Sequence, residues 1–448
     1  MAVLDDAAKE ISVGKKKWTE GLTGYHYLVL GVACFGWLFD TMDQWLYVQA
    51  KTPALSELLA LPGNHATVQW WVGLAQSIFI IGWASGGLLF GMIGDRLGRT
   101  RTMAVTILMY AGFTGLSGLS QTPMQFIILR FLTGLGIGGE FAAGASLVAE
   151  TFPAHARTTA LGLVQATSAL GNVLAGAIYF VVGANPNWGW RWVFAVGLVP
   201  AVLLLAIRLF VKEPEVWHAS RKKAKETGQV VGSIIHLFTD RVLRRNTLVG
   251  VGLGAIGVIG FWGIGTWSAE LIRAALNPEG STDPAFMAAV DRRMAWCVML
   301  QNLGGFFGVM AFTWFAQRSG RKRAFLISLL LCTVVVPTTF YFTKDFITAQ
   351  IMYPLMGFSL LTMFGGYAIY FPELFPTRLR ATGTGFCYNV ARYLSASGPM
   401  VFGYLSSMHG GGLVGIQRAA IMLSGVFILG IVFILPFAPE TKDQPLPE

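Results

Sequence analysis

Twelve long apolar segments alternate with short polar segments along the chain. Each apolar segment has about the 20 residues that an α-helix needs to cross the hydrocarbon core of a bilayer. This pattern predicts an all-α membrane protein with twelve transmembrane helices. The predicted helices span residues 25–48, 68–93, 102–120, 123–149, 158–183, 190–211, 247–272, 293–316, 324–343, 346–371, 381–407 and 415–437.

A polar segment in the middle of the chain divides these helices into two groups of six. Residues 212–246 carry a cluster of basic side chains, and we interpret them as a cytoplasmic linker. Residues 273–292 are predicted to form the second-longest loop. The predicted organisation is a cytoplasmic N-terminal tail (1–24), a first six-helix bundle (25–211), the linker (212–246), a second six-helix bundle (247–437) and a cytoplasmic C-terminal tail (438–448).

The composition agrees with a membrane protein. Of the 448 residues, 54% are hydrophobic and 12% are charged, whereas a soluble domain usually has about 25% charged residues. So few charges cannot cover a water-facing surface, which argues against a soluble enzyme, a disordered chain and a disulfide scaffold. The four cysteines lie inside apolar runs without paired spacing, so we expect neither a disulfide nor a metal site.

The basic residues predict the orientation of the helices. With the N-terminus in the cytoplasm, most of the 33 Lys and Arg residues fall in cytoplasmic segments. This is the positive-inside pattern, and it places both termini in the cytoplasm. It also accounts for the net charge of +10, and we find no separate basic module for nucleic acid. The other basic residues fall in predicted outer loops and at the adjoining outer helix ends (Lys51, Arg191, Arg273, Arg292, Arg293, Lys344 and Arg418) or well inside predicted helices (Arg130 and Arg392).

The two halves share an internal sequence repeat. A Glu-x-Phe-Pro motif followed by a basic residue begins at Glu150 and again at Glu373, an offset of 223 residues. A second motif, Asp-Arg-Leu-Gly-Arg at 95–99, is echoed 222 residues later by Gln-Arg-Ser-Gly-Arg at 317–321. Two motifs with nearly the same offset indicate that a six-helix unit has been duplicated.

At these motifs the chain resembles the major facilitator superfamily. Residues 91–101 are similar to its signature loop between helices 2 and 3, although Gln317 replaces the Asp that is frequent in the second copy of that loop. Pro-Glu-Thr-Lys at 439–442 resembles a signature of the branches related to sugar porters. Gly-Gly-Glu-Phe at 138–141 and Asp-Thr-Met-Asp at 40–43 resemble segments of sialate, metabolite and aromatic-acid proton symporters. The resemblance does not select a substrate.

The resemblance implies a monomeric transporter, not an enzyme, in the cell inner (plasma) membrane. It also implies alternating access, in which charged residues at the cytoplasmic helix ends close the inner side. The predicted gating residues are Asp95, Arg96, Arg99, Glu150, Arg157, Arg318, Arg321, Glu373 and Arg380.

Five charged residues fall well inside predicted helices, where a charge needs a partner or a water-filled cavity. They are Asp40, Asp43, Arg130, Glu140 and Arg392. Asp40 and Asp43 share a helix face and lie at a height similar to that of Arg130. The sugar porters have a similar Asp–Arg pair in proton coupling, which implies that role here, with a slight preference for Asp40. The alternatives are that Asp43 flanks a helix end and that Glu140 makes a polar contact within the first half.

Arg392 lies near the middle of the eleventh predicted helix. Its guanidinium stays charged and has a fork geometry that suits a carboxylate, and an Arg at a similar place is a feature of organic-anion transporters in the superfamily. The alternative is an internal pair with an acidic residue of the first half. The six histidines fall at helix ends or in loops, so proton coupling would use a buried carboxylate.

Further polar and aromatic residues of the predicted helices are candidates for substrate binding. Aromatic side chains at such positions are more often packing residues than ligand contacts. The candidates, besides Arg392, are Gln165, Asn172, Trp262, Gln301, Asn302, Tyr367, Tyr388 and Asn389.

We therefore expect a secondary active transporter that takes up a small organic acid anion together with a proton. A sialate-like sugar acid, a monocarboxylate or an aromatic carboxylate would fit. We expect no cofactor other than the proton as coupling ion, and no partner other than the substrate and the lipid bilayer. The alternatives are a proton-coupled symporter of a neutral sugar or polyol, which Arg392 disfavours, and a non-transporting membrane sensor.

Overall fold

A computed structural model describes residues 18–185, 187–199, 234–376, 379–442 and 444. Over these ranges the chain is helical and contains no strand. The side chains at some further positions, mainly near the ends of α3, α5, α6 and α16, also lie outside the description. Seven of the described helical segments are long and apolar enough to cross a membrane by themselves.

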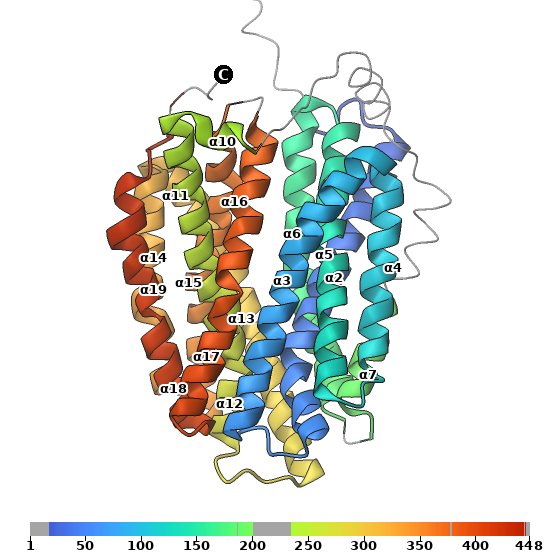
Figure 1. Cartoon of the computed structure of the whole chain (residues 1–448), viewed down its shortest axis with the longest axis vertical. Coiled ribbons are helices and arrows are strands. Elements are labelled where there is room, and N and C mark those ends of the chain that lie inside the picture. Colours follow the sequence, from blue (N-terminus) through green and yellow to red (C-terminus); the bar gives the residue numbers. More distant parts are fainter. Residues whose placement is uncertain (1–17, 186, 200–233, 377–378, 443, 445–448) are drawn as a thin grey trace, which may run out of the picture.

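The first half of the chain forms long antiparallel helices joined by short turns (Figure 1). Its sixth predicted helix is described only over its first turns. The elements are α2 (Gly24–Leu59), α3 (Ala66–Leu97), α4 (Arg99–Ser117), α5 (Pro123–Thr151), α6 (Ala154–Ile178) with the π-helix Tyr179–Gly183, and α7 (Gly189–Val196).

The second half repeats this arrangement, with several helices interrupted by π or 3-10 turns. The elements are α10 (His236–Thr239), α11 (Arg241–Val258) with the π-helix Ile259–Ile264 and the 3-10 turn Gly265–Trp267, α12 (Ser268–Leu276), α13 (Pro284–Ser319), α14 (Arg321–Phe342), α15 (Phe346–Glu373), α16 (Arg380–Ser395), α17 (Ser397–Met408), α18 (Gly412–Leu423) and α19 (Gly425–Leu429) with the π-helix Gly430–Ile434 and the 3-10 turn Leu435–Phe437.

Each half packs as its own bundle, and the two bundles lie side by side (Figure 1). In the first half α3 packs on α5, α4 on α5, and α2 on α6, while in the second half α13 packs on α15 and α11 on α16. Between the halves, α3 meets α17 and α16, and α6 meets α13. We call the two ends of the molecule the α10 end, where Thr441 and Lys442 also lie, and the α12 end.

Glycines allow the closest of these helix contacts. A Cβ atom on Gly138 of α5 would collide with the backbone of α3 at Trp83 and Gly87, and one on Gly308 of α13 would collide with the backbone of α15 at Phe358. Small residues at such crossings let two helix backbones approach, as is usual between membrane helices.

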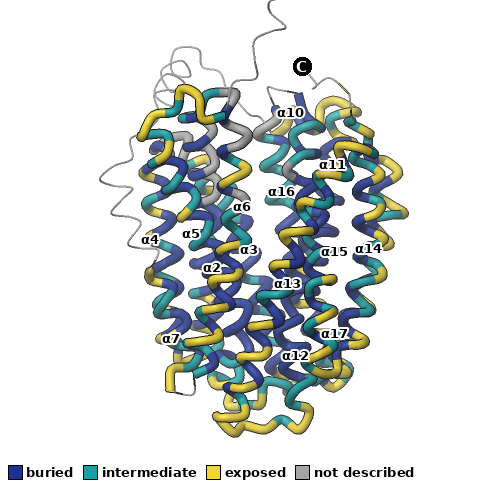
Figure 2. The backbone as a smooth tube through the Cα atoms, turned by 180° about the vertical axis from the view of Figure 1, so that it is seen from behind, coloured by how far each residue is buried: buried dark blue, intermediate teal, exposed yellow. Residues whose placement is uncertain are grey.

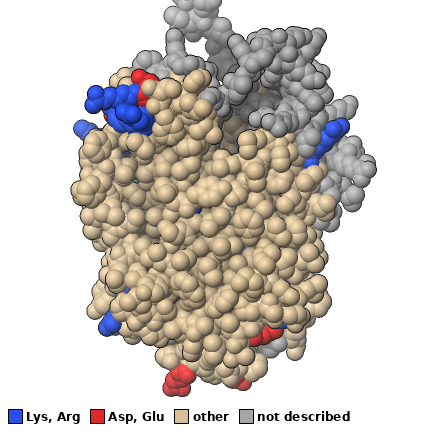
Figure 3. Space-filling view, in the orientation of Figure 1, with Lys and Arg blue, Asp and Glu red and all other residues tan. Residues whose placement is uncertain are grey.

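Apolar side chains cover the outside of the molecule. Buried residues concentrate in the interior and between the bundles, while exposed residues line the outer helix faces (Figure 2). Many exposed residues are large and apolar, among them Leu119, Ile347 and Phe433. On the face seen in Figure 3, charged side chains lie near the two ends and leave a broad uncharged band between them. Such a band suits the hydrocarbon core of a bilayer.

Three predicted helix ends at the α12 end were wrong. The helix predicted to end at residue 48 continues to Leu59, and the predicted loop 273–292 shrinks to residues 277–283 because α12 continues to Leu276 and α13 begins at Pro284. Several of the polar residues that lowered the local hydropathy, among them Lys51, Thr52, Arg273 and Asp291, lie inside these helices and are buried. Lys51 and Arg273, which we expected in outer loops, are therefore helical, with exposed fractions of 0% and 7%.

Candidate functional site

Arg392 lies where α16 faces the first half. It is 5% exposed, and its Nη1 donates a hydrogen bond of 3.0 Å to Oδ1 of Asn389. No acidic side chain within the described part of the chain lies within 4.0 Å of its guanidinium. The internal ion pair that we considered as an alternative is therefore not formed with any described acid.

Aromatic rings surround this guanidinium. It lies 4.1 Å from the ring centroid of Trp83 on α3 and 4.2 Å from that of Tyr388 on α16. Trp262 packs edge-on against Trp83, with 5.3 Å between ring centroids. Trp83 was not among the predicted site residues, although it follows Gly73 and Gln76 at helical spacing on one face of α3. Its Nε1 is buried and has no hydrogen-bond partner in the described residues.

The predicted amide residues form two separate contacts. Asn172 of α6 donates from Nδ2 to Oδ1 of Asn302 on α13 at 2.8 Å, and this bond joins the two halves. Gln301 instead bonds within the second half, because it accepts from Ser268 at 2.6 Å and donates to the carbonyl of Gly265. Of these two amide contacts, only the asparagine pair bridges the interface between the bundles.

The remaining predicted binding residues differ in their freedom to contact a ligand. Tyr367 donates its hydroxyl to the carbonyl of Leu253 at 2.8 Å and stacks on Phe371, so its described contacts are packing contacts. Asn389 binds Arg392 and also lies against Gly87 of α3. The side chain of Gln165 lies outside the described residues.

Asp40 and Glu140 form a pair of neighbouring acids inside the first half. Both are buried, with exposed fractions of 0% and 1%, and their carboxyl groups lie next to each other. Both carboxyl oxygens of Asp40 and Oε1 of Glu140 lack an ordinary hydrogen-bond partner in the described residues. Two such carboxylates repel each other in an apolar site, and a shared proton would relieve that repulsion.

Asp43, rather than the slightly preferred Asp40, is the acid nearest to Arg130. The carboxylate of Asp43 accepts a hydrogen bond from Thr114 at 3.0 Å and interacts electrostatically with Arg130. Asp43 and Arg130 nevertheless do not come within the 4.0 Å of an ion pair. Arg130 donates to Ser117 at 2.5 Å, and its guanidinium lies 4.7 Å from the ring of Phe194. Because α2 extends to Leu59, Asp43 lies well inside a helix and does not flank its end.

The described gating candidates form a charge network within the second half at the α10 end. Arg321 binds Glu373 through Nη2 at 2.8 Å and through Nε at 3.1 Å. Glu373 also accepts from Thr441 at 2.5 Å. Arg318 lies over the ring of Trp314. The side chains of Asp95, Arg96, Arg99, Glu150, Arg157 and Arg380 lie outside the described residues.

Glu440 holds the C-terminal segment to this network. Its carboxylate accepts backbone N–H bonds from Arg321 at 2.9 Å and from Lys322 at 3.1 Å. Burial, the largest single influence, favours the neutral acid, but these bonds together with those from Thr441 and Lys442 outweigh it and hold the pKa of Glu440 below its usual value. The Pro-Glu-Thr-Lys motif thus ties the chain after the last helix to the start of α14.

The α12 end contains a charge cluster that the sequence did not predict. Its members, which we call the α12 cluster, are Lys51, Glu270, Arg273 and Asp291. All four are buried. Arg273 binds Asp291 at 2.7 Å, while Glu270 lies 4.0 Å from both Lys51 and Arg273.

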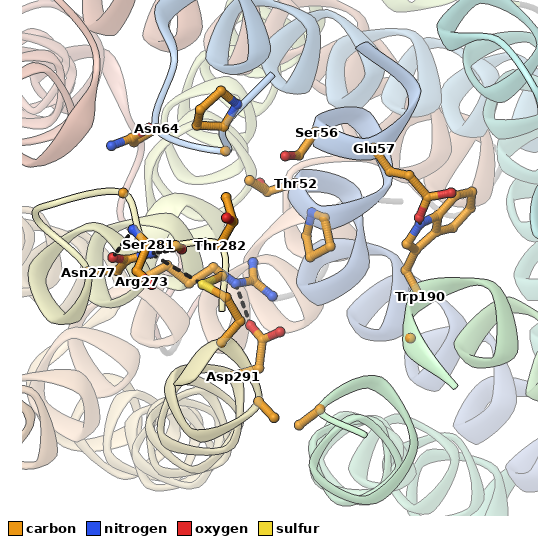
Figure 4. Close-up of a pocket in the computed structure, with 18 of the residues that line it drawn as sticks. Thr52, Ser56, Glu57, Asn64, Trp190, Arg273, Asn277, Ser281, Thr282 and Asp291 are labelled. Carbon is orange, nitrogen blue, oxygen red and sulfur yellow. Dashed lines mark hydrogen bonds and ion pairs between the residues drawn. The ribbon is translucent and has the colours of Figure 1, made fainter. Parts of the chain in front are cut away.

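A pocket of about 550 Å³ opens beside the α12 cluster. Figure 4 shows Arg273 and Asp291 facing each other in it, with Thr52 and Ser56 of α2 on the opposite wall. The lining residues come from both halves and include acidic, basic, amide and hydroxyl side chains. Farther along α2, Glu57 accepts from Arg191 at 2.9 Å and from Trp190 at 2.7 Å. Hydropathy alone could not find this cluster, because it scored Lys51, Arg273 and Asp291 as loop.

Comparison with known proteins decides the family. A family model described as Sugar (and other) transporter matches residues 19–249, just over half of the chain. The chain belongs to this family of the major facilitator superfamily. It is 31% identical to the cis,cis-muconate transport protein of Acinetobacter baylyi, over 85% of this chain and 88% of that protein. It is 30% identical to a probable 4-methylmuconolactone transporter of Cupriavidus pinatubonensis, over 92% of this chain and 90% of that protein.

The fold agrees with this assignment. This chain superposes on the crystal structure of a D-xylose–proton symporter with a TM-score of 0.72 at 18% sequence identity. The match covers 94% of this chain and 99% of the symporter chain. The predicted all-α membrane fold with two helical bundles is confirmed. This major facilitator protein is a multi-pass membrane transporter of a small molecule and not an enzyme, as predicted.

Proposed function

We propose that this transporter takes up a small organic acid anion together with protons. The observation that carries the proposal is Arg392, a buried guanidinium between the two halves that has no acidic partner within 4.0 Å among the described residues. A buried charge without a partner is costly in a membrane protein. A carboxylate ligand would supply the missing counter-ion through paired N–H···O bonds.

The relatives support an acidic substrate. The names of two of them refer to muconate and to a methylmuconolactone, and the first of these is a dicarboxylate. The aromatic surroundings of Arg392 suit a ligand with a flat apolar body next to its carboxylate, because Trp83, Trp262 and Tyr388 offer ring faces and edges. The asparagine pair at Asn172 and Asn302 offers polar groups on the opposite side of the interface.

Proton coupling would use the buried acids of the first half. The Asp40–Glu140 pair would hold one proton between two carboxyl groups, so that loading and releasing that proton changes the charge of the bundle. Asp43 would balance Arg130 in both states. In this proposal the proton is the coupling ion, no other cofactor takes part, and the protein works as a monomer.

The orientation follows from the positive charges. The α10 end would face the cytoplasm, because 24 of the 33 Lys and Arg residues fall in the segments that the positive-inside pattern assigns to that side. The α12 end would then face outward from the inner (plasma) membrane. The described contacts close this outer end, so the molecule would present its central site toward the cytoplasm.

The test is uptake into proteoliposomes with an imposed pH gradient, acidic outside. Muconate, an aromatic monocarboxylate, a sugar acid and a neutral sugar serve as probes. We expect the gradient to stimulate uptake of at least one acid, and Arg392→Ala to abolish it. Stimulated uptake of the neutral sugar alone would establish the sugar symporter instead, and unchanged acid affinity in Arg392→Ala would contradict the role of Arg392.

A further inference from the structure

One guanidinium joins the two halves at the outer end. Nε of Arg273 binds Asp291 of its own half at 2.7 Å. Its Nη2 donates to two groups of the first half, the carbonyl oxygen of Gln49 at 2.6 Å and the hydroxyl oxygen of Tyr179 at 2.8 Å. Asp291 therefore holds the side chain in place while the Nη2 amino group reaches across the interface.

A proline explains why the Gln49 carbonyl is available. In a continuous helix the carbonyl of residue 49 would accept from the N–H of residue 53. Residue 53 is a proline inside α2 and has no N–H. The carbonyl released by Pro53 is the one that Arg273 occupies, and a charged donor forms a stronger bond to it than an amide would. Pro53 and Arg273 thus complement each other across the interface.

The rest of the α12 cluster adds a second cross-half contact. Thr52 donates to Oε1 of Glu270 at 2.6 Å, and Lys51 lies 4.0 Å from the other oxygen of Glu270. In the described residues Lys51 Nζ, Glu270 Oε2 and Arg273 Nη1 lack hydrogen-bond partners. These cross-half bonds lie beside a pocket that has polar groups on its walls, and water could replace the bonds when the halves separate.

We propose that Pro53 and Arg273 form a lock that keeps the outer side of the transporter closed. During opening, Arg273 leaves with Asp291, and water takes its place at the Gln49 carbonyl and the Tyr179 hydroxyl. Weakening the lock shifts the protein toward the state that is open to the outside. The inference concerns only which side of the carrier is open, and it does not depend on whether the substrate is an acid.

The test measures how easily a buried cysteine is reached from outside. Ile80 of α3 is fully buried and lies between Gly73 and Trp83 on the face that meets the second half. Ile80→Cys is labelled with a membrane-impermeant maleimide in intact cells, without substrate, and the chain with only its native cysteines gives the background. Pro53→Ala and Arg273→Gln are introduced into this parent. Pro337→Ala, a proline change inside α14, and Arg292→Gln, a charge removal at an exposed outer position, are the matched controls.

We expect the labelling rate to rise roughly tenfold in Arg273→Gln and to rise less in Pro53→Ala. A tenfold rise corresponds to a shift of about 1.4 kcal/mol in the equilibrium between the closed and open outer side. The alanine supplies an N–H that competes for the Gln49 carbonyl, and it does so without changing any charge. The controls should label at the rate of the parent. Because alanine suits a helix interior better than proline, the thermal unfolding temperature of Pro53→Ala should not fall.

Each result decides one part of the proposal. An unchanged labelling rate in Pro53→Ala overturns the role of the Gln49 carbonyl, and an unchanged rate in folded Arg273→Gln overturns the lock. Should Arg273→Gln fail to reach the membrane, Tyr179→Phe removes only the hydroxyl acceptor and keeps the ring, and an unchanged rate in that variant equally overturns the lock. Absence of acid uptake in proteoliposomes would leave these labelling results standing, since no substrate is used.

Discussion

Arg392 is held by aromatic faces and one amide, which leaves much of its hydrogen-bonding edge for a ligand. The indole of Trp83 comes from the other half, so it helps to position the guanidinium at the interface. We predict that Trp83→Leu raises the KM for a transported acid about 2- to 30-fold, because a cation–π contact contributes about 0.5–2 kcal/mol. Trp83→Phe keeps a ring face and should change the KM less.

Uptake kinetics in proteoliposomes measure this effect. Trp192→Leu is a suitable control, because Trp192 is 57% exposed on α7. Equal KM values for Trp83→Leu and the unchanged protein would show that the indole does not position Arg392 for the substrate.

The two aspartates of α2 are expected to respond differently to neutralisation. Asp40→Asn relieves repulsion with Glu140, so we expect a folded protein that exchanges substrate but is not driven by a pH gradient. Asp43→Asn leaves the buried Arg130 without its nearest acid, and we expect it to lose about 2 kcal/mol or more of stability. Thermal unfolding and gradient-driven uptake, measured on both variants, separate the two roles. The assignment is wrong if Asp40→Asn keeps gradient-driven uptake.

Helix packing inside a bundle depends on particular glycines. A Cβ on Gly138 would meet the backbone of α3, whereas one on Gly112 of α4 would meet nothing within 4 Å. We predict that Gly138→Ala lowers the unfolding temperature in detergent. Gly112→Ala should instead raise stability by about 1 kcal/mol, since alanine is the better helix former. Similar unfolding temperatures for the two variants would contradict the packing role of Gly138.

At the scale of helices, the sequence predicted the apolar spans well and their polar ends poorly. Hydropathy located α3, α5 and α13 because their membrane-facing sides are apolar over many turns. It ended the first helix too early, because residues 49–59 include Lys51 and Pro53, which resemble a loop when tertiary contacts are ignored. Lys51 is buried next to Glu270, which comes from a distant part of the chain, and no local pattern contains that information.

Contacts between distant residues also limit what the sequence could predict about the candidate site. Asp40, Asp43, Arg130, Glu140 and Arg392 could be found from the sequence, because a charge inside an apolar run stands out. Their partners could not, since the pairing of Asp40 with Glu140 and the stacking of Arg392 on Trp83 arise only when helices meet. The roles of these residues in binding and coupling stay predictions until uptake is measured.

At the scale of the whole molecule, the two bundles and the two ends define how the transporter sits in the membrane. The α10 end carries the basic residues near α14 and the C-terminal segment, and the α12 end carries the exposed loop between α12 and α13. We predict that Glu279→Cys in that loop reacts with a membrane-impermeant maleimide added to intact cells, while His236→Cys on α10 reacts only after the membrane is opened. Both positions are exposed in the structure, so a difference in labelling reports sidedness and not burial. The reverse pattern would invert the orientation and place the Pro53–Arg273 lock on the cytoplasmic side, where it would control release of the substrate instead of its capture.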